Sequence, residues 1–329
     1  MKTASRIIFT GALGFVLAAC AGGDTRPAAP DWLDGSAADY PASSYLTGIG
    51  SGDTRDAARD RARADLAKTF RVKIDESASD VRNFSRGADG DSYSQEINRE
   101  LNVQTEQVLE GVTVPEVWQD PATRQFHALA VLERARASLR LRQEIQSLDA
   151  GADAMLAAAR RSDDVFEKAS IAVRVVENQR RRAVVQSMLQ AVDATGRGTP
   201  PRWPLGQLES DLRTALSRIT LEPVASDEWK GLLAGSLGDS GFSLSPDGTY
   251  QASLEVETAE LPKRQGWFWK RAVVSLRISG PGGESLGQQR WEIKESAADP
   301  QTVNLRVRQK VADILENEGR DAILGTVRD

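Results

Sequence analysis

The stretch from Tyr45 to Phe70, YLTGIGSGDTRDAARDRARADLAKTF, joins a strand pattern directly to a helix pattern. Apolar residues alternate with small or polar ones from Tyr45 to Ile49, which predicts a strand. The glycines of GIGSG then predict a tight turn with positive φ. Asp53 or Thr54 fits the N-cap of a following helix. That helix carries an apolar residue at every fourth position, and because two of the four are alanines it can approach a sheet closely: Ala58, Ala62, Leu66 and Phe70.

The segments after this helix predict the rest of a small sheet. Arg71–Ile74 has the pattern of a second strand. Val112–Trp118 and Phe126–Val131 flank the turn residues Asp120–Thr123, which predicts a hairpin. Residues 75–107 are polar, and the sequence leaves their structure open.

The glycines of GIGSGD also invite comparison with phosphate-binding loops, because backbone N–H groups at the start of a helix attract anions. Their spacing is not Gly-x-Gly-x-x-Gly, and no Gly-Lys-Ser/Thr follows. Asp53 would in addition repel a phosphate. A plain turn is therefore the better prediction.

The middle of the chain is predicted to be helical. Residues 133–195 contain no proline and are rich in alanine, arginine, glutamate and leucine. Apolar stripes on residues 165–176 and 185–192 predict two or three antiparallel helices, with Ser162-Asp163 as an N-cap. The stretch TGRGTPPRWP, residues 195–204, marks the clearest domain boundary.

The last third alternates helices and strands. Residues 207–218 and 227–237 have helical patterns, with a short strand at 219–224 between them. Strands follow at 250–260, 267–279 and 285–295, the last two joined by Gly280–Gly283. A final helix begins after Asp299-Pro300. These elements predict an antiparallel sheet with helices on one face, and the chain as a whole is predicted to be α+β.

The N-terminus reads as an export signal. Lys2 and Arg6 precede an apolar run from Ile7 to Ala19, which is too short to span a membrane. The quartet Leu17-Ala18-Ala19-Cys20 resembles the lipobox of bacterial lipoproteins. This resemblance implies cleavage before Cys20, a diacylglycerol on its sulfur and an acyl chain such as palmitate on its amine. Ala21 follows the cysteine, which in such lipoproteins implies the periplasmic face of the outer membrane.

A second resemblance covers about residues 30–134. The PDW at Pro30–Trp32, the YLTGIGSGD stretch and the alanine-rich helix with Ala57, Ala58 and Ala62 resemble the Lpp-twenty type of outer-membrane lipoprotein. The module of that family is also similar to the N-terminal domain of the flagellar H-ring assembly protein. The resemblance implies a small α+β envelope module without known catalysis, and it carries over no active-site residue.

These observations divide the chain into five parts. We expect a signal peptide at 1–19, a lipidated tether at 20–30, an α+β module at 31–134, a helical segment at 135–195 and a C-terminal α+β domain at 205–329. The first 19 residues hold two basic residues and no acidic one, so the net charge of −5 becomes −7 after their removal. An acidic protein is a poor partner for nucleic acid.

The residue inventory argues against the commonest enzymes. His127 is the only histidine and Cys20 the only cysteine, so one chain cannot assemble a Ser-His-Asp triad, a Cys-His pair or a multi-histidine metal site. Paired carboxylates or a Ser-Lys dyad remain open as alternatives, because acids and serines are abundant, but none stands in a distinctive motif. We therefore expect no enzyme, no metal and no cofactor.

One stretch stands out as a candidate contact site, GWFWKR at residues 266–271. Its aromatic residues occupy both faces of a predicted strand, flanked by cations. Trp267, Trp269, Lys270 and Arg271 could bind a protein, a glycan or a membrane headgroup region. The alternative is a tryptophan packed beneath the last helix.

The sequence thus favours a non-catalytic, lipid-anchored periplasmic scaffold or adaptor that binds an envelope protein. The alternative is a cell-wall-active enzyme or carbohydrate-binding module that uses carboxylates and the Trp267 region. The partner, the pathway (flagellar, secretion or wall synthesis) and the oligomeric state are left open.

Overall fold

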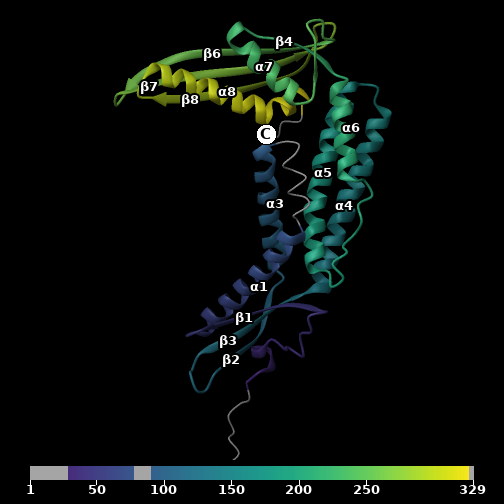
Figure 1. Cartoon of the computed structure of the whole chain (residues 1–329), viewed down its shortest axis with the longest axis vertical. Helices are drawn as coiled ribbons and strands as arrows, with labels where there is room; N and C mark the ends of the chain where they lie inside the picture. The colour runs from purple at the N-terminus through teal and green to yellow at the C-terminus, as the bar shows by residue number, and fades with distance from the viewer. Residues whose placement is uncertain (1–28, 78–89, 326–329) are drawn as a thin grey trace, which may run out of the picture.

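The computed structural model describes residues 29–77 and 90–325, and it has the expected α+β architecture. A small sheet with helix α1 forms one end of the molecule, long helices form the middle, and a second sheet with helices α7 and α8 forms the other end (Figure 1). The expected signal peptide, Cys20 and most of the expected tether lie outside the described residues.

The N-terminal sheet has the strand order β1-β3-β2 and is antiparallel throughout. The predicted hairpin is confirmed as β2 and β3. Helix α1 covers one face, and the short 3₁₀ helix η1 places Trp32 against Leu129 and Val131 of the opposite face. The bounds are η1 Asp31–Asp34, β1 Tyr45–Gly52, α1 Arg55–Ser77, β2 Thr113–Gln119 and β3 Phe126–Glu133.

The predicted glycine turn is wrong, because β1 continues through Gly52 and none of its glycines has a positive φ. These glycines serve close packing instead. A Cβ added at Gly50 would lie 2.1 Å from the backbone nitrogen of Ala62, and one at Gly48 would lie 2.4 Å from that of Leu66. The alanine face of α1 therefore rests directly on the backbone of β1, as the alanine pattern predicted.

The strand predicted at residues 71–74 is also wrong. Helix α1 continues through this segment to Ser77. The reason is the helical period, because Ile74 lies four residues after Phe70 and is buried on the same face. Of the stretch left open by the sequence, residues 90–107 belong to α3, Gly90–Leu109.

The predicted central helices are confirmed as α4, Arg134–Arg161, and α5, Val165–Val192. They form a hairpin whose three-residue connection ends in Asp164. This residue, rather than Ser162 or Asp163, is the N-cap, because its side chain accepts hydrogen bonds from the backbone N–H groups of Phe166 and Glu167. A third helix, α6, Leu205–Ser217, lies against α5 (Figure 1).

The C-terminal sheet has the order β5-β4-β6-β7-β8. Strands β6, β7 and β8 are antiparallel, as predicted. Strand β4 instead runs parallel to both of its neighbours, β5 and β6, and helix α7 forms the crossover between β4 and β5. Helices α7 and α8 cover one face of the sheet (Figure 1). The bounds are β4 Thr220–Val224, α7 Asp227–Asp239, β5 Ser243–Leu244, β6 Tyr250–Arg264, β7 Trp267–Ser279, β8 Ser285–Ala297 and α8 Pro300–Ile323.

Helix α5 belongs to both main hydrophobic cores. Its first half, from Ala169 to Val176, packs with α6, the C-terminal sheet and α8. Its second half, from Val184 to Val192, packs with α1, α3 and β3. A helix of 28 residues is about 42 Å long at about 1.5 Å per residue. One continuous helix therefore sets the separation of the two ends of the molecule.

Hydrogen bonds hold the segment after α5 against α4 and α5. Arg182 is 2% exposed, and its guanidinium donates to Asp149 Oδ1 at 2.7 Å and to the carbonyl oxygen of Pro200 at 3.1 Å. Trp203 Nε1 donates to Asp153 Oδ1 of α4 at 2.9 Å. The expected boundary at residues 195–204 thus begins with an exposed stretch, 195–197, and continues with residues that hydrogen bonds hold against the helices.

Candidate functional site

The candidate contact site lies at the turn between β6 and β7. Gln265 and Gly266 form a two-residue turn in which both have positive φ, 49° and 84°, and Arg264 pairs with Trp267 across it. Two consecutive positive φ values fit a type I′ turn, which matches the twist of a hairpin. The turn lies at the end of the sheet that points away from α4, α5 and α6 (Figure 1). We call residues 261–271 the hairpin end.

The two tryptophans lie on the sheet face that α8 does not cover. In β7 the buried residues Ala272, Val274 and Leu276 face the helices, so the odd-numbered residues face the opposite way. Trp267 is 44% exposed, whereas Trp269 is partly buried beside Leu261 of β6 and Ser296 of β8. Together with Arg264 and Gln265, the two tryptophans and Ser296 line a shallow groove.

Cations surround the aromatic rings of the hairpin end. Lys263 Nζ lies 4.0 Å from the centre of the Phe268 ring, and Lys294 Nζ of β8 lies 5.3 Å from that of Trp269. Such pairs are attractive because the ring face carries negative charge. The other two candidate residues have polar partners. Lys270 Nζ donates to Asn304 Oδ1 of α8 at 2.7 Å, and Arg271 Nη1 lies 3.8 Å from Glu292 Oε1.

The charge of the hairpin end is opposite to that of the whole chain. Its eleven residues, LPKRQGWFWKR, contain four basic residues and no acidic one, in a chain of net charge −5. Most of these side chains are exposed or half-buried. Among the described residues, Trp269 Nε1 is one of three buried side-chain polar atoms with no hydrogen-bond partner.

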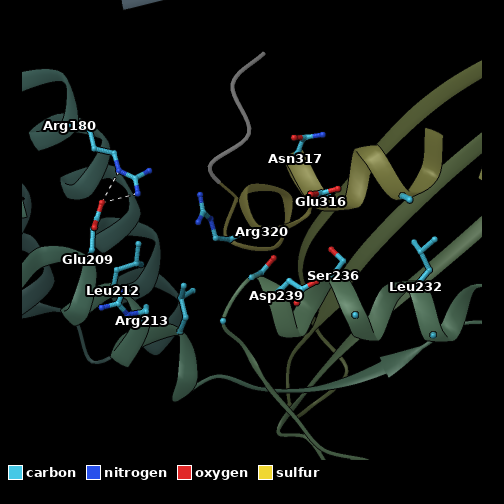
Figure 2. Close-up of a pocket in the computed structure, with 16 residues that line it drawn as sticks. Arg180, Glu209, Leu212, Arg213, Leu232, Ser236, Asp239, Glu316, Asn317 and Arg320 are labelled. Carbon is cyan, nitrogen blue, oxygen red and sulfur yellow. Dashed lines mark hydrogen bonds and ion pairs between the residues drawn. The ribbon is translucent and has the colours of Figure 1, made fainter. Parts of the chain in front are cut away.

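A cavity of about 700 Å³ lies between the central helices and the C-terminal layer. Figure 2 shows Arg180 and Glu209 on one wall and Ser236, Asp239, Glu316 and Asn317 on the other. Arg180 Nε and Nη2 both donate to Glu209 Oε1, at 3.1 and 2.9 Å, and both residues are at least nine-tenths buried. Ser236 Oγ donates to the carbonyl oxygen of Leu315 at 2.8 Å, so its proton is already engaged.

These walls do not resemble a catalytic centre. A serine nucleophile needs a base that accepts its proton, and the proton of Ser236 goes to a backbone carbonyl. His127 lies in β3, paired with Trp118 of β2 at a ring-centre distance of 5.6 Å. Within residues 29–77 and 90–325, no group of three or more histidine, cysteine or acidic residues is placed to hold a metal ion. The helices of the same residues include none that is long and apolar enough to cross a membrane.

The structure brings Trp267, Trp269, Lys270 and Arg271 together at one end of the sheet, whereas Cys20 lies outside the described residues. Sequence reasoning missed Lys294 and Leu261, because both come from neighbouring strands. Their positions depend on the strand register, which pairs Leu261 with Trp269 and Lys294 with Arg271. The cavity was missed as well, since its lining residues come from four helices and a loop that show no shared motif.

Comparison with solved structures gives weak similarities only. A minor lipoprotein of Acinetobacter baumannii is 20% identical, with a TM-score of 0.26, and the match covers 32% of this chain and 91% of that one. The rare lipoprotein B of Shewanella oneidensis is 18% identical over 32% of this chain and 92% of its own, with a TM-score of 0.23. The secreted protein HP1454 of Helicobacter pylori matches 84% of this chain and 97% of its own, at 12% identity and a TM-score of 0.40. We draw no functional conclusion from scores of this size.

No curated protein matches the chain. A family model does match, that of the LPP20 lipoprotein, over residues 30–133. This range contains η1, the three-stranded sheet, α1 and α3, and so coincides with the N-terminal module. The resemblance predicted for this part of the chain is confirmed, while the likeness to the flagellar protein stays a prediction. About a third of the chain, residues 30–133, is therefore similar to the LPP20 lipoprotein.

Proposed function

We propose that this protein is a non-catalytic scaffold, anchored by acyl chains on Cys20 to the periplasmic face of the outer membrane, that presents the hairpin end to a partner in the cell envelope. The anchor is supported by the lipobox pattern at Leu17–Cys20 and by the lipoprotein family of residues 30–133. The choice of membrane rests on Ala21, the residue after the cysteine.

The observation that carries the proposal is the exposure of Trp267. A tryptophan is costly to leave in water, since full burial of a large apolar side chain contributes about 1.5–3 kcal/mol. Trp267 is nevertheless 44% exposed, at the turn of a hairpin and among cations. Half-exposed aromatic residues with neighbouring arginines are typical of binding hot spots.

The two-core arrangement supports a scaffold. Because α5 packs with the N-terminal module at one end and with the C-terminal sheet at the other, the hairpin end cannot move freely relative to the module. A partner bound at the hairpin end is then held at a defined distance from the module.

The test is a pair of matched variants, Trp267→Ala and Leu286→Ala. Leu286 is 45% exposed on β8, at the opposite end of the same sheet. We expect both variants to melt within a few degrees of the unchanged protein, because both side chains are half-solvated. Only Trp267→Ala should weaken partner recovery from crosslinked envelopes, by about 30-fold for a hot spot of ~2 kcal/mol.

Two results would overturn the proposal. A loss of ~3–5 kcal/mol of stability in Trp267→Ala would mean that the ring is part of the core. Equal recovery of the partner with both variants would mean that the hairpin end is not the contact surface.

A further inference from the structure

We infer that the partner of the hairpin end is an anionic phospholipid surface, so that residues 261–271 form a second membrane contact beside the lipid anchor. This inference rests on the proposed function, since it names the partner of the same site. The membrane meant is the one that holds the acyl chains of Cys20.

Charge is the first argument. The hairpin end carries Lys263, Arg264, Lys270 and Arg271, and Lys294 lies beside it on β8. Three carboxylates of the neighbouring strands lie next to Lys270 and Arg271, those of Glu260, Glu292 and Glu295, so Lys263 and Arg264 beside the turn carry most of the attraction. Because these cations lie close together in a chain of net charge −5, an anionic surface would be attracted here. Clusters of four or more basic residues near a bilayer are typical of binding to anionic lipids.

The placement of the cations favours an end-on contact with a plane. Lys270 lies on the sheet face toward α8, where it contacts Asn304, whereas Arg271 lies on the opposite face, near Glu292. A protein that docked on one face of the hairpin would meet only half of these charges. A bilayer into which the turn dips can meet cations of both faces, with Lys263 and Arg264 beside the turn and Lys270 and Arg271 farther along the strands.

The aromatic residues also fit a membrane contact. Trp267 follows the turn residue Gly266 directly, and indole rings prefer the boundary between headgroups and acyl chains. Lys263 and Lys294 lie over the rings of Phe268 and Trp269, so their ammonium groups stay next to the aromatic layer. Long basic side chains of this kind reach outward to the phosphates while their stems remain apolar.

The anchor makes a weak contact of this size effective. One tryptophan and a few basic residues bind a bilayer only reversibly, but a tethered site meets its own membrane at high effective concentration. Residues 21–30 extend at most about 35 Å, while α5 alone is about 42 Å long. Because residues 21–30 span less than the length of α5, the hairpin end could not touch the anchoring membrane if the molecule stood upright on it. The contact requires that the long axis of the molecule lie along the membrane surface.

The experiment uses residues 20–329 with Cys20 unacylated, so that all described residues are present and the anchor is not. Binding is measured by flotation with vesicles of phosphatidylcholine alone and of phosphatidylcholine mixed with phosphatidylglycerol. We expect binding to the mixed vesicles only, falling as salt rises. Quenching of tryptophan fluorescence by lipids brominated on the acyl chains should be weaker in Trp267→Ala, which keeps Trp269 but lacks the indole ring beside the turn.

Matched charge reversals complete the test. Arg264→Glu removes a cation of the hairpin end, and Arg290→Glu makes the same change on β8, at an exposed position outside it. Because a basic residue near an anionic surface contributes a factor of about five in binding, Arg264→Glu should weaken binding at least about fivefold and Arg290→Glu much less. Equal effects of the two variants, or equal binding to both vesicle types, would overturn the inference.

Two further outcomes identify the alternatives. If Arg264→Glu abolishes crosslinking to an envelope protein while no vesicle binds, the partner is an acidic protein, and the inference fails while the scaffold proposal stands. If acylated protein in one set of vesicles clusters a second, anchor-free set of mixed vesicles, the contact is with another membrane, and the commitment to the anchoring membrane is wrong.

Discussion

Replacing Gly50 by alanine tests the packing that defines the N-terminal module. The added Cβ would lie 2.1 Å from the Ala62 nitrogen and 2.5 Å from the Ala58 oxygen, both of them backbone atoms that no rotamer change can move. Ordinary contacts begin at 3.4 Å, so strand and helix must separate by about 1.3 Å. The face that separates is fully buried, with Leu66 and Phe70 both 0% exposed.

The cost follows from that separation. A gap of 0.5–1 Å already forfeits a quarter to a half of the dispersion energy, and each large side chain gains about 1.5–3 kcal/mol from burial. Two hydrogen bonds also lengthen, from the Ile49 N–H to Asp65 Oδ2 at 3.0 Å and from Arg61 Nη1 to the Ser51 carbonyl at 2.6 Å. We expect Gly50→Ala to lower the free energy of unfolding by about 3 kcal/mol.

The assay is urea unfolding followed by circular dichroism, with Gly231→Ala as control. Gly231 is exposed in α7, and a Cβ there has no atom within 4 Å. The same substitution should therefore leave stability unchanged or raise it by about 0.5–1 kcal/mol. A Gly50→Ala protein as stable as the unchanged one would refute the contact between α1 and β1.

Three other predictions concern the anchor, the boundary and the last helix. Cys20→Ala should abolish labelling with radioactive palmitate and leave uncleaved precursor, and unchanged labelling would contradict the lipobox assignment. Limited proteolysis should cut first within residues 195–204, with the fragments eluting together because α5 shares the C-terminal core; separation of the fragments, or resistance of this stretch, would contradict the packing. The hydroxyl and backbone N–H of Thr302 hold the pKa of Asp299, the N-cap of α8, below its usual range. This carboxylate therefore stabilises the fold above its unfolded pKa of about 3.9. The contribution is lost as pH falls through the lower folded pKa, so Asp299→Ala should lower the melting temperature at pH 7 and match the unchanged protein in acid.

Long helices with regularly spaced apolar residues could be predicted from the sequence, because this spacing shows which face of each helix is buried. The stripes on residues 165–176 and 185–192 correspond to the two halves of α5, and Asp299-Pro300 marks the start of α8. The stripes do not reveal that the two halves face different cores. That division depends on which elements pack against α5, and no local pattern encodes it.

In both errors in the N-terminal module, tertiary packing outweighs a local preference. Gly48 and Gly50 were assigned to a turn because glycine permits positive φ, but glycine also lacks a Cβ, and here the second property decides. Residues 71–74 were assigned to a strand from their local pattern, yet the burial of Ile74 on the face of α1 continues the helix through them.

The candidate site could be predicted in part. The odd and even alternation of Trp267 and Phe268 follows from any strand, and β7 has the predicted bounds. The cations over the rings depend on the pairing of three strands, so Lys294 could be placed beside Trp269 only after the register was known. Trp267 is 44% exposed because α7 and α8 cover the other face of the sheet, and the sequence alone does not show which face these helices cover.

The most direct test of the central claim is photo-crosslinking in intact cells that produce the acylated protein. A photoreactive amino acid replaces Trp267 in one strain and Leu139 in another, Leu139 being 59% exposed on α4. Our account predicts adducts with an envelope component from position 267 and none from position 139. An absence of adducts from position 267 in protein that is correctly acylated and folded would contradict it.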